Sequence, residues 1–128
     1  MKATPEVALQ VPVVWVAICR LDELLRERGV AALIGGTQIA LFRLWNDEVL
    51  AVGNHDPFSH SNVISRGIVG SRGQSATVAS PMYKQVFDLR TGVCLDAPGT
   101  RLPVYRVRVI DGLVQVVRPA GATPPPEV

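Results

Sequence analysis

The residues of this chain best suited to metal chemistry are two cysteines and two histidines. Cys19 and Cys94 are far apart in the sequence, whereas His55 and His60 are close together. Two Cys and two His make up a known zinc ligand set, and the histidine spacing is within the range of such sites. Each cysteine, however, lies alone on a predicted strand, and a buried apolar thiol is the more common fate of such a residue. We therefore expect no metal site in this chain.

The same residue types would allow a cysteine nucleophile. Cys94, one of the histidines and an acid such as Asp56 or Asp96 supply the groups that covalent catalysis needs. Nothing in the local sequence marks either cysteine as activated, which favours core thiols. The glycine-rich residues 67–73 (GIVGSRG) lack the strand–loop–helix context and the Lys-Ser/Thr end of a phosphate loop. We expect no catalytic residue in the chain.

Strand signals dominate the elements that must position these residues. The β-branched and aromatic residues 13–18 (VVWVAI) are typical of a strand, with Trp15 expected in the core. The dipeptides Gly35-Gly36 and Asp111-Gly112 predict two-residue hairpin turns. Strands are predicted over residues 13–18, 30–34, 37–44, 49–52, 67–69, 86–88, 93–95, 104–110 and 113–117.

One segment, residues 21–28 (LDELLRER), predicts a helix of about two turns. Leu21, Leu24, Leu25 and Arg28 have helical spacing, and Gly29 follows as a stop signal. Many short strands with regular turn signals around one short helix indicate an all-β antiparallel sandwich or partly open barrel.

The middle of the chain is polar and is predicted to form loops. Residues 53–65 (GNHDPFSHSNVIS) and 70–75 (GSRGQS) carry few core formers. Loops of this length inside a compact domain are usually functional or form a partner surface.

Length and charge restrict the class of protein. The chain has 128 residues, which fits one domain. Its formal net charge is +2, and it lacks the basic stripe of a nucleic-acid binder. Residues 7–19 are apolar but too few to span a bilayer, and no signal peptide is evident. We therefore expect a cytoplasmic protein without membrane contact. We predict an N-terminal extension (1–12), a domain (13–118) and a flexible, Pro-rich tail (119–128).

Three longer segments occur in a recognisable order: NHDPFSHSNVISRGIVG (residues 54–70), VASPMYKQVFDLRTGVCLD (78–96) and PVYRVRVIDGLVQV (103–116). They resemble the Rieske family and, within it, the cluster-free small subunits of NAD(P)H-dependent assimilatory nitrite reductases. Rieske proteins carry Cys-x-His in the first segment and Cys-x-x-His in the second. A Phe-Asp-Leu-x-Thr-Gly turn follows, and it survives here as residues 87–92. The resemblance implies a Rieske-like fold.

The four positions that hold the cluster in a Rieske protein carry other residue types here. A Rieske [2Fe–2S] cluster needs two thiolates on one iron and two imidazoles on the other. Placed on the motif, the first pair is Asn54 and Asp56 and the second is Ser80 and Tyr83, none of which supplies either group. We therefore expect no cofactor in this chain.

Without a metal, the two loops need another source of order. Side chains that can accept hydrogen bonds from backbone N–H groups, as in Asx and Ser turns, are those of Asn54, Asp56, Ser59 and Ser80. Pro57 and Pro81 restrict the backbone at the loop tips. We expect the shape of the tips to persist without a redox centre.

The apolar residues Phe58, Met82 and Tyr83 fall at these predicted tips. They either pack the two loops against each other or form a docking patch, because exposed aromatic residues and methionine are enriched at the centres of interfaces. In the second case His60 and Lys84 form the polar rim of the patch.

The resemblance implies a non-catalytic small subunit of an NAD(P)H nitrite reductase. Its partner would be a large subunit that carries FAD, siroheme and an Fe–S cluster and reduces nitrite to ammonium in nitrate assimilation. The alternative is a free-standing binding module that reuses the Rieske scaffold for another oxidoreductase or a small ligand, because a fold does not determine a function.

Overall fold

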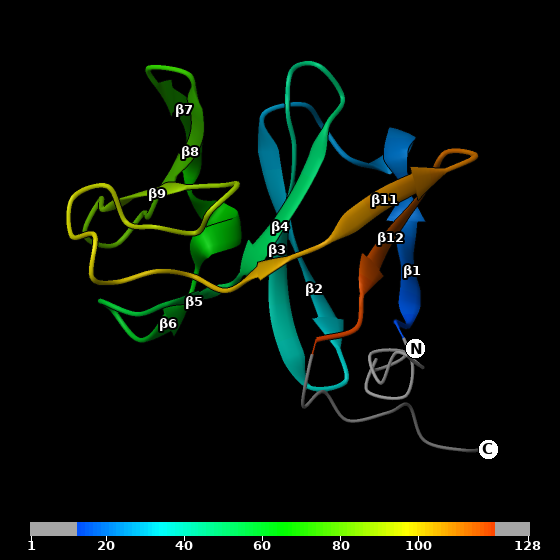
Figure 1. The fold of residues 1–128 in the computed structure, drawn as a ribbon, viewed down its shortest axis with the longest axis horizontal. Coiled ribbons are helices and arrows are strands. Elements are labelled where there is room, and N and C mark those ends of the chain that lie inside the picture. Colours follow the sequence, from blue (N-terminus) through cyan, green and yellow to red (C-terminus); the bar gives the residue numbers. More distant parts are fainter. Residues whose placement is uncertain (1–12, 120–128) are drawn as a thin grey trace, which may run out of the picture.

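The computed structural model describes residues 13–119 and consists of short antiparallel strands (Figure 1). The described residues form four small sheets with the strand orders β1-β12-β11, β10-β4-β3-β2, β5-β6 and β7-β8-β9. The predicted all-β fold is confirmed. The strands are β1 (Trp15–Arg20), β2 (Arg28–Ile34), β3 (Thr37–Arg43), β4 (Val49–Gly53), β5 (His55–Asp56), β6 (Ser61–Asn62), β7 (Ile68–Arg72), β8 (Ser75–Ala79), β9 (Val86–Asp88), β10 (Val104–Tyr105), β11 (Val107–Ile110) and β12 (Leu113–Val117).

Two single-turn 3-10 helices, η1 (Leu21–Glu23) and η2 (Ile64–Arg66), join these strands. Within residues 13–119, no helix has the length and apolar character needed to cross a bilayer. The predicted N-terminal extension lies outside the described residues. The predicted tail also lies outside them, except for Pro119, which is buried.

Strand β3 is the centre of the molecule because both of its faces are buried. Ile39 and Leu41 pack into a core shared with β1 and β12, whereas Ala40 and Phe42 pack into a second core shared with β8 and β9. Successive side chains of a strand point to opposite faces, so one strand can serve both cores. Figure 1 accordingly shows β2, β3 and β4 between the sheet β1-β12-β11 and the sheet β7-β8-β9.

The predicted hairpins are confirmed. Gly35 and Gly36 both have positive φ between β2 and β3, and the pairing runs in register from Ile34↔Thr37 to Arg28↔Arg43. Asp111 and Gly112 also have positive φ and connect β11 to β12. Such turns match the twist of the strands they join, which is why these dipeptides were reliable signals.

The predicted helix over residues 21–28 is wrong. Only Leu21–Glu23 is helical, and the chain is extended at Leu24 before β2 begins at Arg28. The Arg43 side chain donates hydrogen bonds to the carbonyl oxygens of Leu21 (3.2 Å) and Leu24 (2.7 Å), two groups that a continuing α-helix would use itself. In this extended segment Leu24 is buried and Leu25 is exposed, so only one of the two leucines packs into the core.

Gly29 does not stop a helix but lies within β2, where it permits close packing. A Cβ at this position would approach the carbonyl oxygen of Ser65 to 2.4 Å and the Phe42 ring to 2.5 Å. The glycine therefore lets β2 pass directly over η2 and the core.

Three further predictions are corrected. Residues 93–95, predicted as a strand, form only isolated bridges, with Cys94 opposite Phe87 and Val93 opposite Arg101. Residues 70–75, predicted as a loop, form the end of a hairpin in which β7 pairs with β8 around Gly73. Strand β7 is largely exposed, but Val69 packs against the second core and Val78 of β8 is buried in it, contacts that the polar sequence of the hairpin end does not indicate. The predicted single strand 104–110 is split at Arg106: β10 pairs with β4, whereas β11 pairs with β12. The chain thus passes from one sheet to the other at this residue.

Trp15, which we expected in the core, is only half-buried. Its ring instead lies against two guanidinium groups, with the Arg108 Cζ 4.2 Å and the Arg106 Cζ 5.5 Å from the ring centroid. Because β12 lies between β1 and β11, this Arg–aromatic contact runs across the face of β12.

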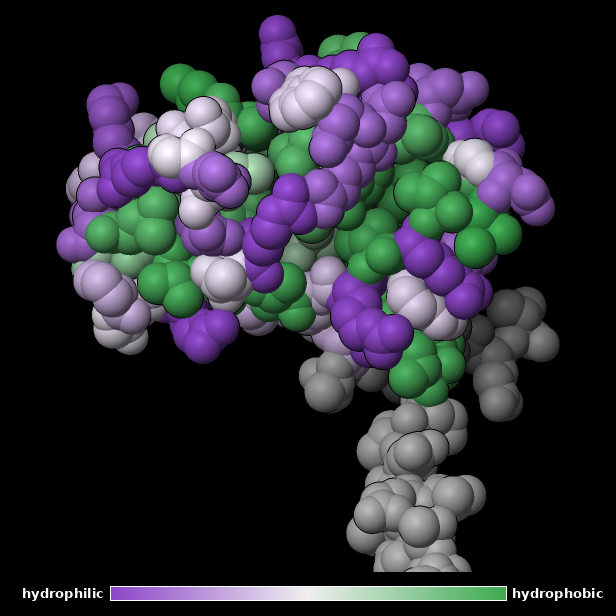
Figure 2. Space-filling model, turned by 45° about the horizontal axis from the view of Figure 1, so that its top comes forward, coloured by the Kyte–Doolittle hydropathy of each residue, from purple (hydrophilic) through white to green (hydrophobic). Residues whose placement is uncertain are grey.

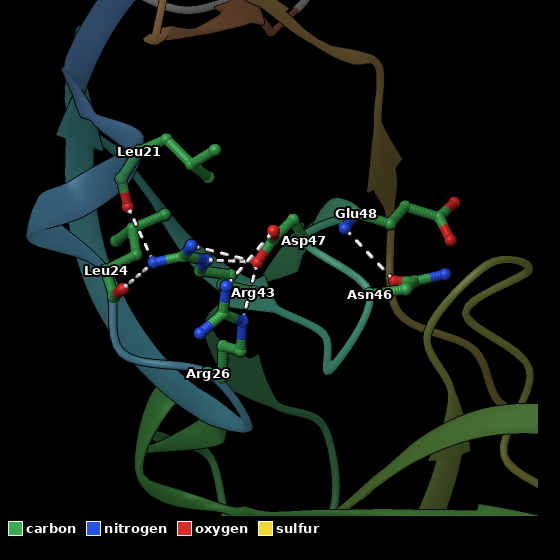
Figure 3. Close-up of polar contacts among 7 residues, drawn as sticks. All are labelled: Leu21, Leu24, Arg26, Arg43, Asn46, Asp47 and Glu48. Atoms are coloured by element: carbon green, nitrogen blue, oxygen red, sulfur yellow. Dashed lines mark hydrogen bonds and ion pairs between the residues drawn. The ribbon is translucent and has the colours of Figure 1, made fainter.

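Arg43 joins three segments next to η1 (Figure 3). Besides the two leucine carbonyls it contacts Asp47, whose carboxylate lies 3.0 Å from the Arg43 Nε and also accepts a bond from Arg26. The Arg43 side chain is 13% exposed, whereas that of Arg26 is 56% exposed. Asp47 itself has positive φ in the turn before β4. The Arg43 contacts therefore tie the β3–β4 turn to the segment that replaces the predicted helix.

We expect Arg43→Met to lower the free energy of unfolding by about 1–3 kcal/mol, because it removes a donor from each of the two leucine carbonyl groups and one of the two arginine partners of Asp47. Urea denaturation monitored by tryptophan fluorescence measures the change. The matched variant Arg26→Met removes only the exposed partner of Asp47 and should have a much smaller effect. An equal effect of both substitutions would show that the carbonyl contacts of Arg43 are unimportant.

Candidate functional site

The site predicted from the sequence lies where two loops meet, one between β4 and η2 and the other between β8 and β9. Three of the four cluster-type positions are buried here: Asn54, Asp56 and Ser80 are at most 1% exposed. The fourth, Tyr83, is 61% exposed. The structure thus brings three of these polar residues into the interior and leaves the tyrosine on the surface.

Asn54 organises the first loop. Its Nδ2 donates to the Gln38 side chain (3.0 Å) and to the carbonyl oxygen of Asn62 (3.2 Å), while its Oδ1 accepts from the Ser65 N–H (2.8 Å). Its own backbone carbonyl accepts a further hydrogen bond from the Ile64 N–H. A buried amide is stable only with such partners, and here they connect β3, β6 and η2.

Asp56 and Ser80 connect the two loops directly. The Ser80 hydroxyl donates to the Asp56 Oδ2 at 2.5 Å, across a sequence separation of 24 residues. The Asp56 Oδ1 accepts from the backbone N–H groups of Phe58 (2.8 Å) and Ser59 (3.4 Å). Both carboxylate oxygens are therefore bonded within the protein.

These hydrogen bonds determine the ionisation of Asp56. Burial by itself would raise the pKa of the carboxyl group. The donors, first the Ser80 hydroxyl and then the backbone N–H of Phe58, outweigh burial and hold the pKa of Asp56 below its usual value. Asp56 is thus a carboxylate at neutral pH, with no tendency to act as a proton donor there.

The two loops contain turns of the same design. The first turn (residues 56–60) and the second turn (residues 80–84) each begin with a polar residue followed by a proline. In each, the first residue's carbonyl accepts from the N–H of the fifth residue, at 2.8 Å for His60 and 3.0 Å for Lys84. Each fifth residue has positive φ, 61° and 64° respectively.

In both turns the side chain of the first residue also accepts from the N–H of the third residue: Asp56 from Phe58, and Ser80 from Met82 (3.3 Å). The Ser80–Asp56 hydrogen bond joins these two equivalent positions. The predicted Asx and Ser turns are thus present, and the two turns face each other as a pair.

Comparison with known proteins identifies the family. The model of the Rieske-like [2Fe–2S] domain matches residues 14–117. The NADH nitrite reductase small subunit of Escherichia coli K12 is 43% identical over 103 residues, covering 80% of this chain and 95% of that protein. The chain belongs to this family. Its Rieske-like fold and the resemblance seen in the sequence are thereby confirmed.

Other members of the family extend the comparison. A solved structure from Mycobacterium tuberculosis, described as an NADH-dependent nitrite reductase small subunit, is 51% identical with a TM-score of 0.83. The match covers 86% of this chain and 99% of that one. The nitrite reductase [NAD(P)H] large subunit of Klebsiella oxytoca contains a segment that is 42% identical over 102 residues. That match covers 80% of this chain but only 11% of the Klebsiella protein.

In this family member the residues at the cluster positions do not fit a [2Fe–2S] cluster. Asn54 and Ser80 supply no thiolate, and neither Asp56 nor Tyr83 supplies an imidazole. The geometry adds a second reason, because a cluster between the two turns would have to separate Ser80 from Asp56, which are in hydrogen-bond contact. Among the described residues, no three His, Cys, Asp or Glu side chains are grouped as metal ligands.

The cysteines and histidines considered first do not converge. Cys94 is buried in the core with Phe42 and Phe87, whereas Cys19 packs against the core on the other side of β3. Burial, with a smaller contribution from the Glu23 carboxylate, raises the pKa of the Cys19 thiol, which is the opposite of an activated nucleophile. The rings of His55 and His60 lie 6.0 Å apart on the surface.

The proposed partner contacts separate into two groups. Phe58 is partly buried, and its ring lies 6.1 Å from that of Phe87 in the core. Met82 and Tyr83, by contrast, are 50% and 61% exposed. His60 and Lys84 are also exposed. Of the two alternatives left open by the sequence, packing describes Phe58, and a docking role for the others stays a prediction.

Sequence reasoning missed the partners of the buried polar residues. Gln38, Asn62 and Ser65 hold Asn54, but they come from three different elements. The repeated polar-residue–proline pair, Asp56-Pro57 and Ser80-Pro81, was the one local signal for a matched pair of turns. Nothing local indicated that the two first residues bond to each other.

We expect Ser80→Ala to lower the free energy of unfolding by about 1.5–3 kcal/mol, because a buried carboxylate loses a donor. Tyr83→Ala, in the same turn but exposed, is the matched control and should change stability by no more than about 0.5 kcal/mol. Urea denaturation gives both values. If Ser80→Ala is as stable as the control, the Ser80–Asp56 bond is not what holds the turns together.

The lowered pKa of Asp56 predicts a pH dependence of stability. A carboxylate whose pKa is lower in the folded chain stabilises the fold above its usual value of 3.8, and this stabilisation is lost as the pH falls through the folded pKa. Asp56→Asn should therefore be less stable than the natural protein at neutral pH, and the difference should shrink below about pH 4.

Urea denaturation at a series of pH values checks this difference. Other carboxyl groups with a lowered pKa, namely Asp47, Glu48, Asp88 and Asp96, titrate in both proteins and cancel in the comparison. A difference that stays constant down to pH 3 would contradict the assignment of the buried carboxylate.

Proposed function

We propose that this chain is the non-catalytic small subunit of an NAD(P)H-dependent nitrite reductase. In this proposal it associates with a large subunit that reduces nitrite to ammonium, and it contributes structure or regulation rather than chemistry. The observation that carries the proposal is the family match along the domain, including 43% identity to the Escherichia coli small subunit.

The chemistry of the paired turns supports the non-catalytic part. A general acid or base needs a pKa near the working pH and a free position for the substrate. Asp56 has a lowered pKa, and both of its oxygens are bonded to Ser80 and to the first turn. The three buried residues at the cluster positions thus use their polar side-chain groups to stabilise the loops.

The Klebsiella protein supports the choice of partner. A segment similar to this chain makes up about a tenth of a polypeptide named as a nitrite reductase large subunit. A domain that is covalently part of the larger chain in one organism is expected to contact the equivalent chain where the two are separate. The free-standing binding module has no comparable support.

The remaining parts of the proposal concern the partner and the cell. The large subunit is proposed to carry FAD, siroheme and an Fe–S cluster, to take electrons from NAD(P)H, and to act in nitrate assimilation in the cytoplasm. The small subunit would then cover part of the electron path or hold the domains of the large subunit in their relative positions.

Co-expression with the large subunit of the same organism tests the proposal. We expect the two chains to co-purify and nitrite-dependent NAD(P)H oxidation to be higher with the small subunit present. Iron analysis of the isolated chain is expected to find none, because its ligand set does not fit a cluster. The proposal fails if the chains do not associate and the chain has no effect on the large subunit's activity.

A further inference from the structure

The paired turns are alike in backbone but differ in what their third residue does. In the first turn this residue is Phe58, which packs against Phe87 and anchors the pair to the core. In the second turn it is Met82, which is 50% exposed, followed by Tyr83, which is 61% exposed. Within residues 13–119, the fold therefore uses the apolar side chain of one turn and leaves those of the other uncovered.

A third exposed apolar side chain lies in the sheet β7-β8-β9, at the end from which the second turn begins. Ile68, the first residue of β7, is 76% exposed and pairs with Ala79, which directly precedes the second turn. Figure 2 shows apolar residues among polar ones at this end of the molecule, on the left, over the region of β5–β9. Isolated exposed apolar residues are ordinary, but a group of large ones is typical of an interaction surface.

The charges around this group have one sign. Arg66 at the end of η2 and Lys84 at the end of the second turn are exposed. Asp56 is the one acidic residue within residues 54–66 and 80–85, and it is buried. The next two carboxylates along the chain are bonded within the protein: Asp88 accepts from the N–H groups of Arg90 and Thr91. Asp96 accepts from the Val86 N–H and from Arg72. A basic rim around apolar side chains is complementary to an apolar surface with acidic residues at its edge.

The backbone that carries these side chains is held in place. Ser80 begins the second turn and is bonded to Asp56, and the turn closes through the Lys84 N–H, with Lys84 at a φ of 64°. A non-glycine residue in this region is strained and is often found where the surrounding structure positions a functional segment. A preformed surface also loses less conformational entropy on binding than a flexible loop.

We propose that the second-turn face, defined as Ile68, Met82, Tyr83, Lys84 and Arg66, is the surface by which this chain docks onto the nitrite reductase large subunit. The inference rests on the proposed function and adds the site and its chemistry. Met82 and Tyr83 form the centre of the contact, Lys84 and Arg66 pair with acidic residues of the large subunit, and the Ser80–Asp56 bond orients the turn.

Affinity measurements with the purified large subunit of the same organism test this face. The double variant Met82→Ala/Tyr83→Ala should raise the Kd at least about tenfold, as expected for the centre of an interface. The control Trp45→Ala removes an aromatic side chain that is 73% exposed and lies beside the β7–β8 turn, at the far end of that hairpin. It should leave the Kd within about twofold.

A charge variant tests the rim. Lys84→Glu should slow association and make the Kd less sensitive to salt, because it places a negative charge against acidic residues. Arg106→Glu, on the opposite side of the molecule next to Trp15, is the control and should change neither. Urea denaturation of each variant, compared with the natural chain, shows whether the fold is intact.

The possible results separate the two proposals. If the natural chain does not bind the large subunit at all, the proposed function fails. If it binds, but the folded double variant binds as well as the Trp45→Ala control, the docking face is wrong and the function stands. Sedimentation could instead show that the natural chain forms a dimer that the double variant abolishes while large-subunit binding persists. The face would then be an interface between two copies, and the docking proposal would be overturned.

Discussion

The hydrogen bond from Ser80 to Asp56 is the interaction on which the distinctive end of this molecule depends. A carboxylate in a dry environment is costly unless donors surround it, and Asp56 has a hydroxyl and two backbone N–H groups. The same bond joins two loops that are distant in sequence and places two similar turns face to face. A Rieske protein links these loops through metal coordination, whereas this chain links them through neutral and charged hydrogen bonds.

The two cores and the base of the first loop hold this contact in place. Strand β3 supplies side chains to both cores, and Phe87 connects the second core to Phe58 of the first turn. Asn54 adds bonds to β3, β6 and η2, so the first loop is fixed at its base as well as at its tip. The stability of the domain therefore comes from residues behind the tips, and the side chains at the surface of the second turn are free to differ without loss of the fold.

Local sequence signals succeeded where the structure depends on backbone preference. Gly35-Gly36 and Asp111-Gly112 were correctly predicted as turns because they adopt positive φ readily. Local sequence signals failed where a residue distant in the sequence determines the structure. The apolar spacing of residues 21–28 suggested a helix, but Arg43 binds the carbonyl oxygens that the helix would need. Arg106 divides a well-alternating segment because its two halves pair with different sheets. Trp15 was expected in the core because of its residue type, but its ring lies against the guanidinium groups of Arg106 and Arg108.

Residue types and their order were enough to identify the family and to show that the cluster ligands are missing. Both depend only on which residue types occur in which order, and Asn54, Asp56, Ser80 and Tyr83 lack the necessary thiolates and imidazoles wherever they lie. What these residues do instead follows from the three-dimensional arrangement of the chain. Whether Asp56 meets Ser80, whether Phe58 turns inward, and whether Tyr83 stays exposed depend on contacts between segments far apart along the chain. A hydrogen bond or a packing contact is a property of two groups and the distance between them, and residue order does not contain that distance.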